Sequence, residues 1–337
     1  MSLIKGKVCS FSCQTTSLFH TSRQQYATLV KCAPFILGST IRGAMLKDMI
    51  EREGCPHLAQ LETEKNSCKI RKIHLSCDRK CSVKPFFLSP PQAFFSFGEF
   101  EPKEEKKGFY SSSTRIAINR CCNSVSEGAM EKIEAIIPET PFQFSLTLFG
   151  ESLEVSEEAK ASIRMLADGT GLGRFKSIGY GRFKIVDVKE KDFGEVVEEK
   201  TRKIKEIVEE RERIQLLLTT PLVLGDGENV HYPINEREAL GKKIGKDIKE
   251  GLKGIIDEPL SFPIQEVEAC IRPDFISRFS YESGRRENRL VAWKDSRITF
   301  SVNRVEERQL EQLAVASLLG IGDWREWGFG RFEVERS

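Results

Sequence analysis

Apolar and polar residues alternate with two different periods along this 337-residue chain. Residues 142–149 (FQFSLTLF) alternate with a period of two, which predicts a half-buried strand. Residues 156–167 instead place Ala159, Ile163 and Leu166 on one face of a helix that begins at Ser156. The same two periods predict strands at 3–13, 213–224 and 296–302, and helices from Ser39, at 236–252 and at 305–319.

One glycine-rich motif occurs twice. Its pattern is G-h-G-x5-G-h-G-R-F, where h is apolar, and it spans 171–183 and 320–332. A predicted helix precedes each copy, and a short predicted strand follows each, at 182–188 and 331–335. Two matches in register, each closing one half of the chain, indicate an internal duplication.

The order of the predicted elements is strand, helix, strand, twice in each half. This order is typical of the ferredoxin-like scaffold that RNA-recognition motifs also use. We therefore predict an α+β protein with two tandem ferredoxin-like (RRM-like) domains, each ending in helix, glycine-rich loop and strand. The predicted parts are a first domain at 1–190 with a cysteine-containing insertion at about 52–84, a charged connecting helix at 191–213, and a second domain at 214–337.

Overall charge does not identify a ligand, because 52 basic residues stand against 50 acidic ones. The segment 65–84 is locally basic, which is typical either of a phosphate-facing surface or of a solvated loop. No apolar run approaches the roughly 20 residues that span a bilayer, and the N-terminus lacks the apolar core of a signal peptide. We expect a cytoplasmic protein without a membrane partner.

Four cysteines lie close together in the predicted insertion, with the spacing C-x12-C-x8-C-x3-C. Four thiolates suit tetrahedral zinc, and a segment with little apolar content needs a staple to become ordered. The alternative is a loop with free thiols. The predicted ligands of one structural zinc are Cys55, Cys68, Cys77 and Cys81, with His57 and His74 as other possible fourth ligands.

Both glycine loops resemble the C-terminal glycine-rich loop of the RAMP superfamily of CRISPR-associated proteins. Residues 35–50 (FILGSTIRGAMLKDMI) resemble the first-helix motif of that superfamily, and residues 113–148 resemble the middle of its type III members. The resemblance implies ferredoxin-like domains that bind or process CRISPR RNA inside effector complexes with several subunits.

Within the superfamily the chain is most similar to the large RAMP subunit of type III-D complexes, which implies a noncatalytic protein that holds guide RNA. The second resemblance is to the endoribonucleases that process CRISPR repeats without metal, for which His20 is the candidate catalytic residue. Residues 27–39 (ATLVKCAPFILGS) contain no acid where target-cutting members carry an aspartate. A dinucleotide site is disfavoured, because such a site follows a strand and opens a helix.

Glycine lets the backbone approach a phosphate closely, and neighbouring arginine and lysine side chains add charge-assisted bonds. The alternative for each position is an ordinary turn, helix cap or surface charge. The first loop is the more basic, so we expect it to grip phosphate and the second to mix packing with stacking by Trp324 and Trp327. The predicted RNA contacts are Ser39, Arg42, Arg115, Arg120, Gly171, Gly173, Arg174, Lys176, Gly179, Gly181, Arg182, Gly320, Gly322, Arg325, Gly328, Gly330 and Arg331.

Overall fold

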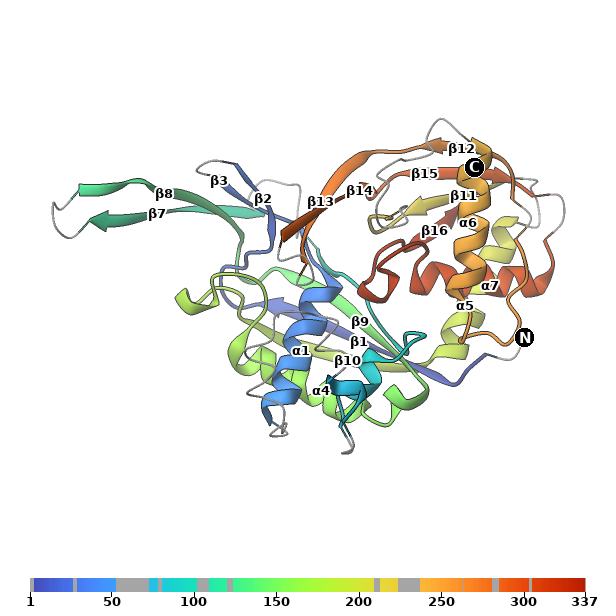
Figure 1. Cartoon of the computed structure of the whole chain (residues 1–337), viewed down its shortest axis with the longest axis horizontal. Helices are drawn as coiled ribbons and strands as arrows, with labels where there is room; N and C mark the ends of the chain where they lie inside the picture. The colour runs from blue at the N-terminus through green and yellow to red at the C-terminus, as the bar shows by residue number, and fades with distance from the viewer. Residues whose placement is uncertain are drawn as a thin grey trace.

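The computed structural model describes most of the chain, and Figure 1 shows it as two α+β halves joined by a helix. The described residues are 3–26, 29–52, 73–77, 81–101, 109–119, 124–208, 213–223, 237–262, 264–280, 285–302 and 305–336. Among them, no helix has the length and apolar character needed to cross a membrane.

The first half is an antiparallel sheet with two helices packed on one face. The strand order is β10-β1-β9-β6-β4, and β5 also pairs with β9. The helices α1 and α4 cover the lower face of this sheet in Figure 1. The elements are β1 (Gly6–Thr15), β4 (Phe35–Ile36), α1 (Gly38–Arg52), β5 (Ala93–Phe95), β6 (Gly98–Phe100), β9 (Pro141–Phe149), α4 (Ser156–Met165) and β10 (Phe183–Asp192).

Alternation along these strands produces the core of the first half. Phe11 of β1 and Phe144 of β9 are register partners, and their rings stack with centroids 4.9 Å apart beneath the helices. The residues next to these phenylalanines in sequence, such as Ser10 on β1 and Ser145 on β9, point to the opposite face of the sheet. This opposite face is polar and faces away from α1 and α4.

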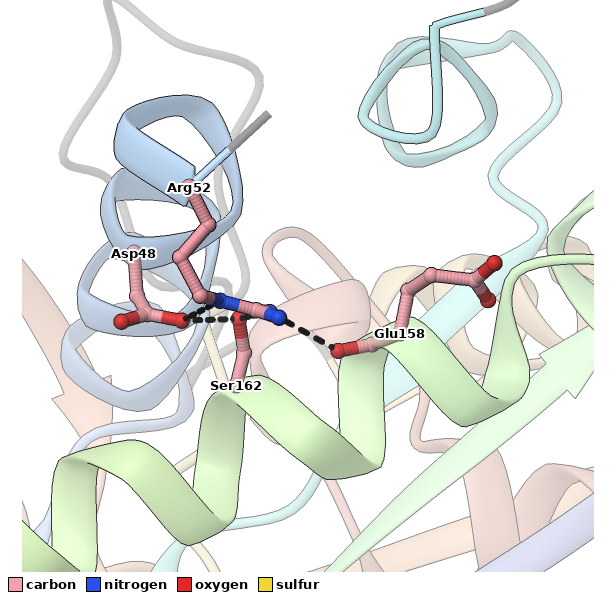
Figure 2. Close-up of polar contacts among 4 residues, drawn as sticks. All are labelled: Asp48, Arg52, Glu158 and Ser162. Atoms are coloured by element: carbon pink, nitrogen blue, oxygen red, sulfur yellow. Dashed lines mark hydrogen bonds and ion pairs between the residues drawn. The ribbon is translucent and has the colours of Figure 1, made fainter. Parts of the chain in front are cut away.

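The two helices of the first half are joined by a polar network, which Figure 2 shows. Arg52 donates from Nε to Asp48 Oδ2 (2.7 Å) within α1, and from Nη2 to Ser162 Oγ of α4 (2.6 Å). Ser162 Oγ in turn donates to Asp48 Oδ2 (2.5 Å), and Arg52 Nη2 also reaches the Glu158 carbonyl oxygen (3.3 Å). Charge-assisted bonds of this kind fix the helices against each other where α1 ends.

The second half repeats the same order. Its sheet runs β12-β15-β11-β16, so the first strand of each half lies between the third and the last, and the second lies outside the third. The helix α5 connects the halves and packs on α7. The elements are α5 (Phe193–Val208), β11 (Arg213–Leu218), α6 (Arg237–Gly251), β12 (Gln265–Cys270), β15 (Arg297–Ser301), α7 (Glu307–Leu319) and β16 (Phe332–Glu335).

Each half also carries a β-hairpin between its second and third sheet strands. In the first half the hairpin is long and projects from the body (Figure 1). The elements are β7 (Tyr110–Asn119) and β8 (Ser124–Ile136), beside which lie β2 (Ser22–Tyr26) and β3 (Leu29–Cys32), and in the second half β13 (Pro273–Ser280) and β14 (Arg285–Ala292).

Most predicted helices and strands are confirmed to within a few residues at their ends, but the strand predicted at 213–224 ends at Leu218 and the connecting helix predicted at 191–213 ends at Val208. The hairpin of the second half was not predicted from the sequence. The segments 65–72 and 78–80 of the predicted basic patch lie outside the described residues, as do Cys55, His57, Cys68 and Arg120. Arg115 is on β7, but its side chain is also outside the described part.

Candidate nucleic-acid interface

The two glycine loops have the same backbone frame. In the first loop the amide of Leu172 donates to the Gly181 carbonyl oxygen (2.9 Å), and in the second that of Ile321 donates to Gly330 (3.0 Å). Phe175 and Trp324, at the same motif position, both adopt left-handed backbone angles, with φ of 60° and 62°. The duplication seen in the sequence therefore extends to the three-dimensional structure of the loops.

Glycine is required in these loops by contact with the chain's own backbone. A Cβ atom on Gly181 would lie 2.0 Å from the Leu172 carbonyl oxygen, and one on Gly330 would lie 1.9 Å from that of Ile321. Likewise, a Cβ on Gly173 would lie 2.5 Å from the carbonyl oxygen of His20, which follows β1. The glycines thus hold each loop tightly against the end of the first strand of its own half.

This packing corrects one prediction, that the glycine amides are open to phosphate. The amides at six of the eight motif glycines already donate to carbonyl oxygens of the chain, at 2.8–3.0 Å. Any ligand of these loops is therefore expected to contact side chains rather than these amides. The six are Gly171, Gly179, Gly181, Gly320, Gly328 and Gly330, while no amide bond is assigned to Gly173 or Gly322.

The first loop is exposed and basic. Arg174, Lys176 and Arg182 all lie at the surface, and the guanidinium of Arg174 sits 5.2 Å from the centre of the Phe175 ring. Tyr180 Oη lies 2.9 Å from Ser113 Oγ on β7, so the loop is fixed to the base of the projecting hairpin. The exposed surface of this loop is therefore positively charged.

The second loop is enclosed by the first half. A Cβ on Gly328 would lie 2.7 Å from the Phe95 carbonyl oxygen, and one on Gly38, the first residue of α1, would lie 2.4 Å from the Trp327 carbonyl oxygen. The ring of Phe329 packs edge-on against that of Phe97, with centroids 5.0 Å apart. The second loop therefore joins the two halves.

This enclosure corrects the predictions for Arg325 and Arg331. The Arg325 guanidinium lies 5.5 Å from the centre of the Phe94 ring, and Arg331 Nη1 donates to Ser145 Oγ of the first half (3.5 Å). Burial lowers the pKa of both arginines, that of Arg331 to about 10. Both guanidinium groups therefore pack at the junction between the halves.

The start of α1 is occupied in a similar way. Arg42 donates from Nη2 to the Phe86 carbonyl oxygen (2.8 Å), and its guanidinium lies 5.0 Å from the centre of the Phe87 ring. Ser39 follows Gly38, against which the second loop packs. At this helix start Gly38 is buried by the second loop, whereas Ser39 and Arg42 are half-buried.

His20 is fully buried beside the first loop. Its Nδ1 donates to the Glu134 carbonyl oxygen (2.6 Å), and its ring lies 5.1 Å from that of Phe175. Burial lowers its pKa, which favours the neutral form of the ring. The buried imidazole thus packs between the first loop and the hairpin strand β8.

Part of the predicted metal site is described. Cys77 is buried, and Cys81 Sγ lies 3.9 Å from His74 Nδ1, while Cys55 and Cys68 lie outside the described residues. Within the described part no three acidic, histidine or cysteine side chains gather to hold a metal ion. The zinc prediction thus depends on the two cysteines that are not described.

No curated protein matches the chain. Among solved structures, a cryo-EM structure of a type III-B Cmr-beta complex bound to cognate target RNA contains a similar chain, with 14% sequence identity and a TM-score of 0.37. The match covers 55% of this chain and 61% of that one. A family model described as "RAMP superfamily" matches residues 33–184, which run from the strand before α1 through the first glycine loop.

Proposed function

We propose that the protein is an RNA-binding subunit of a type III-like CRISPR effector complex, and that it holds CRISPR RNA through its first glycine loop. The observation that carries this proposal is the contrast between two loops of identical frame. One presents Arg174, Lys176 and Arg182 at the surface, whereas the other is packed into the junction between the halves. The RAMP superfamily match covers the exposed copy.

The fold supports the same role. In both halves the strand order places the first strand between the third and the last, an order that supports a ferredoxin-like arrangement. We propose two tandem domains of this type, with a cysteine-containing insertion in the first. The sequence motifs most resemble those of the large RAMP subunit of type III-D complexes, and we propose that role. The partners would be CRISPR RNA and other effector subunits.

Binding would depend on charge-assisted bonds to phosphate oxygens. The three cations of the first loop are carried on a backbone that the glycines and the bond between Tyr180 and Ser113 hold rigid. Ordering the loop in advance reduces the entropy lost on binding. Because contacts of this kind act on the phosphate backbone, the affinity should depend strongly on salt and weakly on base sequence.

Charge reversal at Arg182 tests the proposal. Each lost phosphate contact is expected to lower the affinity for single-stranded RNA about fivefold at ~0.1 M salt and to reduce the salt slope by about 0.7. Lys246→Glu on α6 is the matched control, because Lys246 is exposed on the second half and the charge change is the same. Equal affinities for wild type, Arg182→Glu and Lys246→Glu would refute RNA binding by this loop.

The same experiment with labelled repeat RNA distinguishes a binding subunit from the alternative, a metal-independent endoribonuclease. We expect binding without cleavage, because the candidate base His20 is buried and its Nδ1 is bonded to a carbonyl oxygen. Cleavage at one site that is lost in His20→Val would instead assign the enzyme role.

A further inference from the structure

The register of the edge strand β10 contains a bulge with a specific consequence. Cys13 of β1 pairs with Ile185 of β10, and the preceding residue of β1, Ser12, pairs with Asp187. Val186 therefore has no partner on β1 and is an extra residue in β10. Val186 is 64% exposed. Without this bulge, strict alternation would turn every later side chain of β10 to the opposite face.

Because of the bulge, lysines on both sides of it share one face of the sheet. Lys184 pairs with Gln14, and Lys189 pairs with Ser10, whereas the intervening Val188 pairs with the core residue Phe11. Both lysines are exposed and lie on the polar face, away from α1 and α4. We call this surface the lysine face, and its members are Ser10, Ser12, Gln14, Gln143, Ser145, Lys184, Asp187 and Lys189.

The lysine face is continuous with the first glycine loop. Arg182 of the loop precedes Lys184 by two residues, a spacing that keeps side chains on one side of an extended chain. The path from the loop along β10 is therefore lined by cations, and small hydroxyl and amide groups fill the space between them.

The chemistry of the lysine face fits a sugar–phosphate backbone. None of its members is aromatic, so it has no platform for base stacking, in contrast to single-strand binding surfaces that stack bases. Serine hydroxyls and glutamine amides form hydrogen bonds with phosphate and ribose oxygens, and lysines supply point charges. Asp187, which lies 3.6 Å from Lys189 as an ion pair, is its one acidic member.

We infer that the lysine face is a second RNA contact, which carries the backbone of single-stranded RNA away from the first glycine loop without reading its bases. This inference rests on the proposed function of the loop. Lys184 and Lys189 are separated by roughly 15 Å of extended chain. Short RNAs held at the loop should therefore not reach Lys189, and longer ones should.

The first test is binding of oligouridylates of increasing length to Lys184→Glu/Lys189→Glu. The matched control is Lys246→Glu/Lys249→Glu, which reverses two exposed lysines of α6 on the second half. Losing two phosphate contacts is expected to weaken binding of the longer oligonucleotides by about tenfold or more at ~0.1 M salt, and to lower the salt slope by about 1.4. The shortest oligonucleotides should lose less.

The second test is a gain of affinity, which misfolding does not produce. Asp187→Asn removes the acidic member and frees Lys189, so the longer oligonucleotides should bind about two- to fivefold more tightly. If both face variants bind like the control while Arg182→Glu still weakens binding, the lysine face is not a contact and the loop proposal stands. If Arg182→Glu also has no effect, the loop proposal fails as well.

Discussion

Arg331 Nη1 donates a hydrogen bond to Ser145 Oγ across the junction of the two halves, at 3.5 Å. Arg331 closes the second glycine motif, as Arg182 closes the first. The backbone amides of the two arginines make equivalent hydrogen bonds to a hydroxyl that follows the first strand of their half. The Arg182 amide donates to Ser17 Oγ at 3.0 Å, and the Arg331 amide donates to Thr220 Oγ1 at 2.9 Å. One motif position therefore has the same backbone geometry in an exposed and in a buried setting.

Because the guanidinium of Arg331 is buried, replacing it with an apolar side chain is expected to raise the free energy of unfolding. Arg331 Nε and Nη2 are buried with no hydrogen-bond partner among the described residues, and burial lowers the pKa of the side chain to about 10. Replacing such a cation by an apolar side chain of similar length removes its desolvation cost. Arg331→Met is therefore expected to raise the free energy of unfolding by about 1–2 kcal/mol in urea titrations.

The matched control for this change is Arg182→Met. Its side chain is exposed, so its effect should stay within about 0.5 kcal/mol. A clear loss of stability in Arg331→Met alone would mean that the guanidinium makes favourable bonds in solution and that the junction is not arranged as described.

Two glycines of α1 test the docking of the second loop. A Cβ on Gly38 would lie 2.4 Å from the Trp327 carbonyl oxygen, whereas a Cβ on Gly43 would have no atom within 4 Å. Gly38→Ala should lower the free energy of unfolding by about 1–3 kcal/mol through overpacking. Gly43→Ala should raise it by about 0.5–1 kcal/mol, because alanine favours helix. Similar effects of the two variants would contradict the packing of Trp327 on α1.

The local structure could be predicted from the sequence where it depends on local patterns. The alternation at 142–149 and the helical spacing of Ala159, Ile163 and Leu166 appear in β9 and α4, because one face of each element is buried in its own half. The glycine motif also predicted two equal loops, since backbone constraints are carried by the residues themselves.

The environment of each loop could not be predicted in this way. Arg331 and Arg325 occupy the same motif positions as Arg182 and Lys176, and only the packing of one half on the other separates buried from exposed. The bulge at Val186 was also missed, although the adjacent apolar residues Ile185 and Val186 interrupt the alternation in RFKIVDV. The packing of one half on the other decides the environment of each loop, and no local period records it.

Metal analysis tests the zinc prediction for Cys55, Cys68, Cys77 and Cys81. One zinc per chain is expected in the purified protein, with a loss of thermal stability on chelation. Cys77→Ser should lower the stoichiometry, whereas Cys270→Ser, an exposed cysteine on β12, should not. A stoichiometry near zero, without any effect of chelator, would instead favour free thiols.

His20 predicts a dependence of stability on pH. Burial lowers its pKa below the ordinary value of 6.5, so at pH values between the two pKa values the unfolded chain binds more protons than the folded one. The free energy of unfolding should therefore be fully developed above about pH 6.5 and fall as the pH drops below it, by at most about 1.4 kcal/mol per pH unit.

The second half has Val223 at the position equivalent to His20, which also follows the first strand and accepts a hydrogen bond from its glycine loop. Accordingly, His20→Val is expected to remove this part of the pH dependence in urea titrations between about pH 7.5 and pH 5. An unchanged slope in His20→Val would assign the dependence to other groups and would show that the imidazole is solvated beside the first loop.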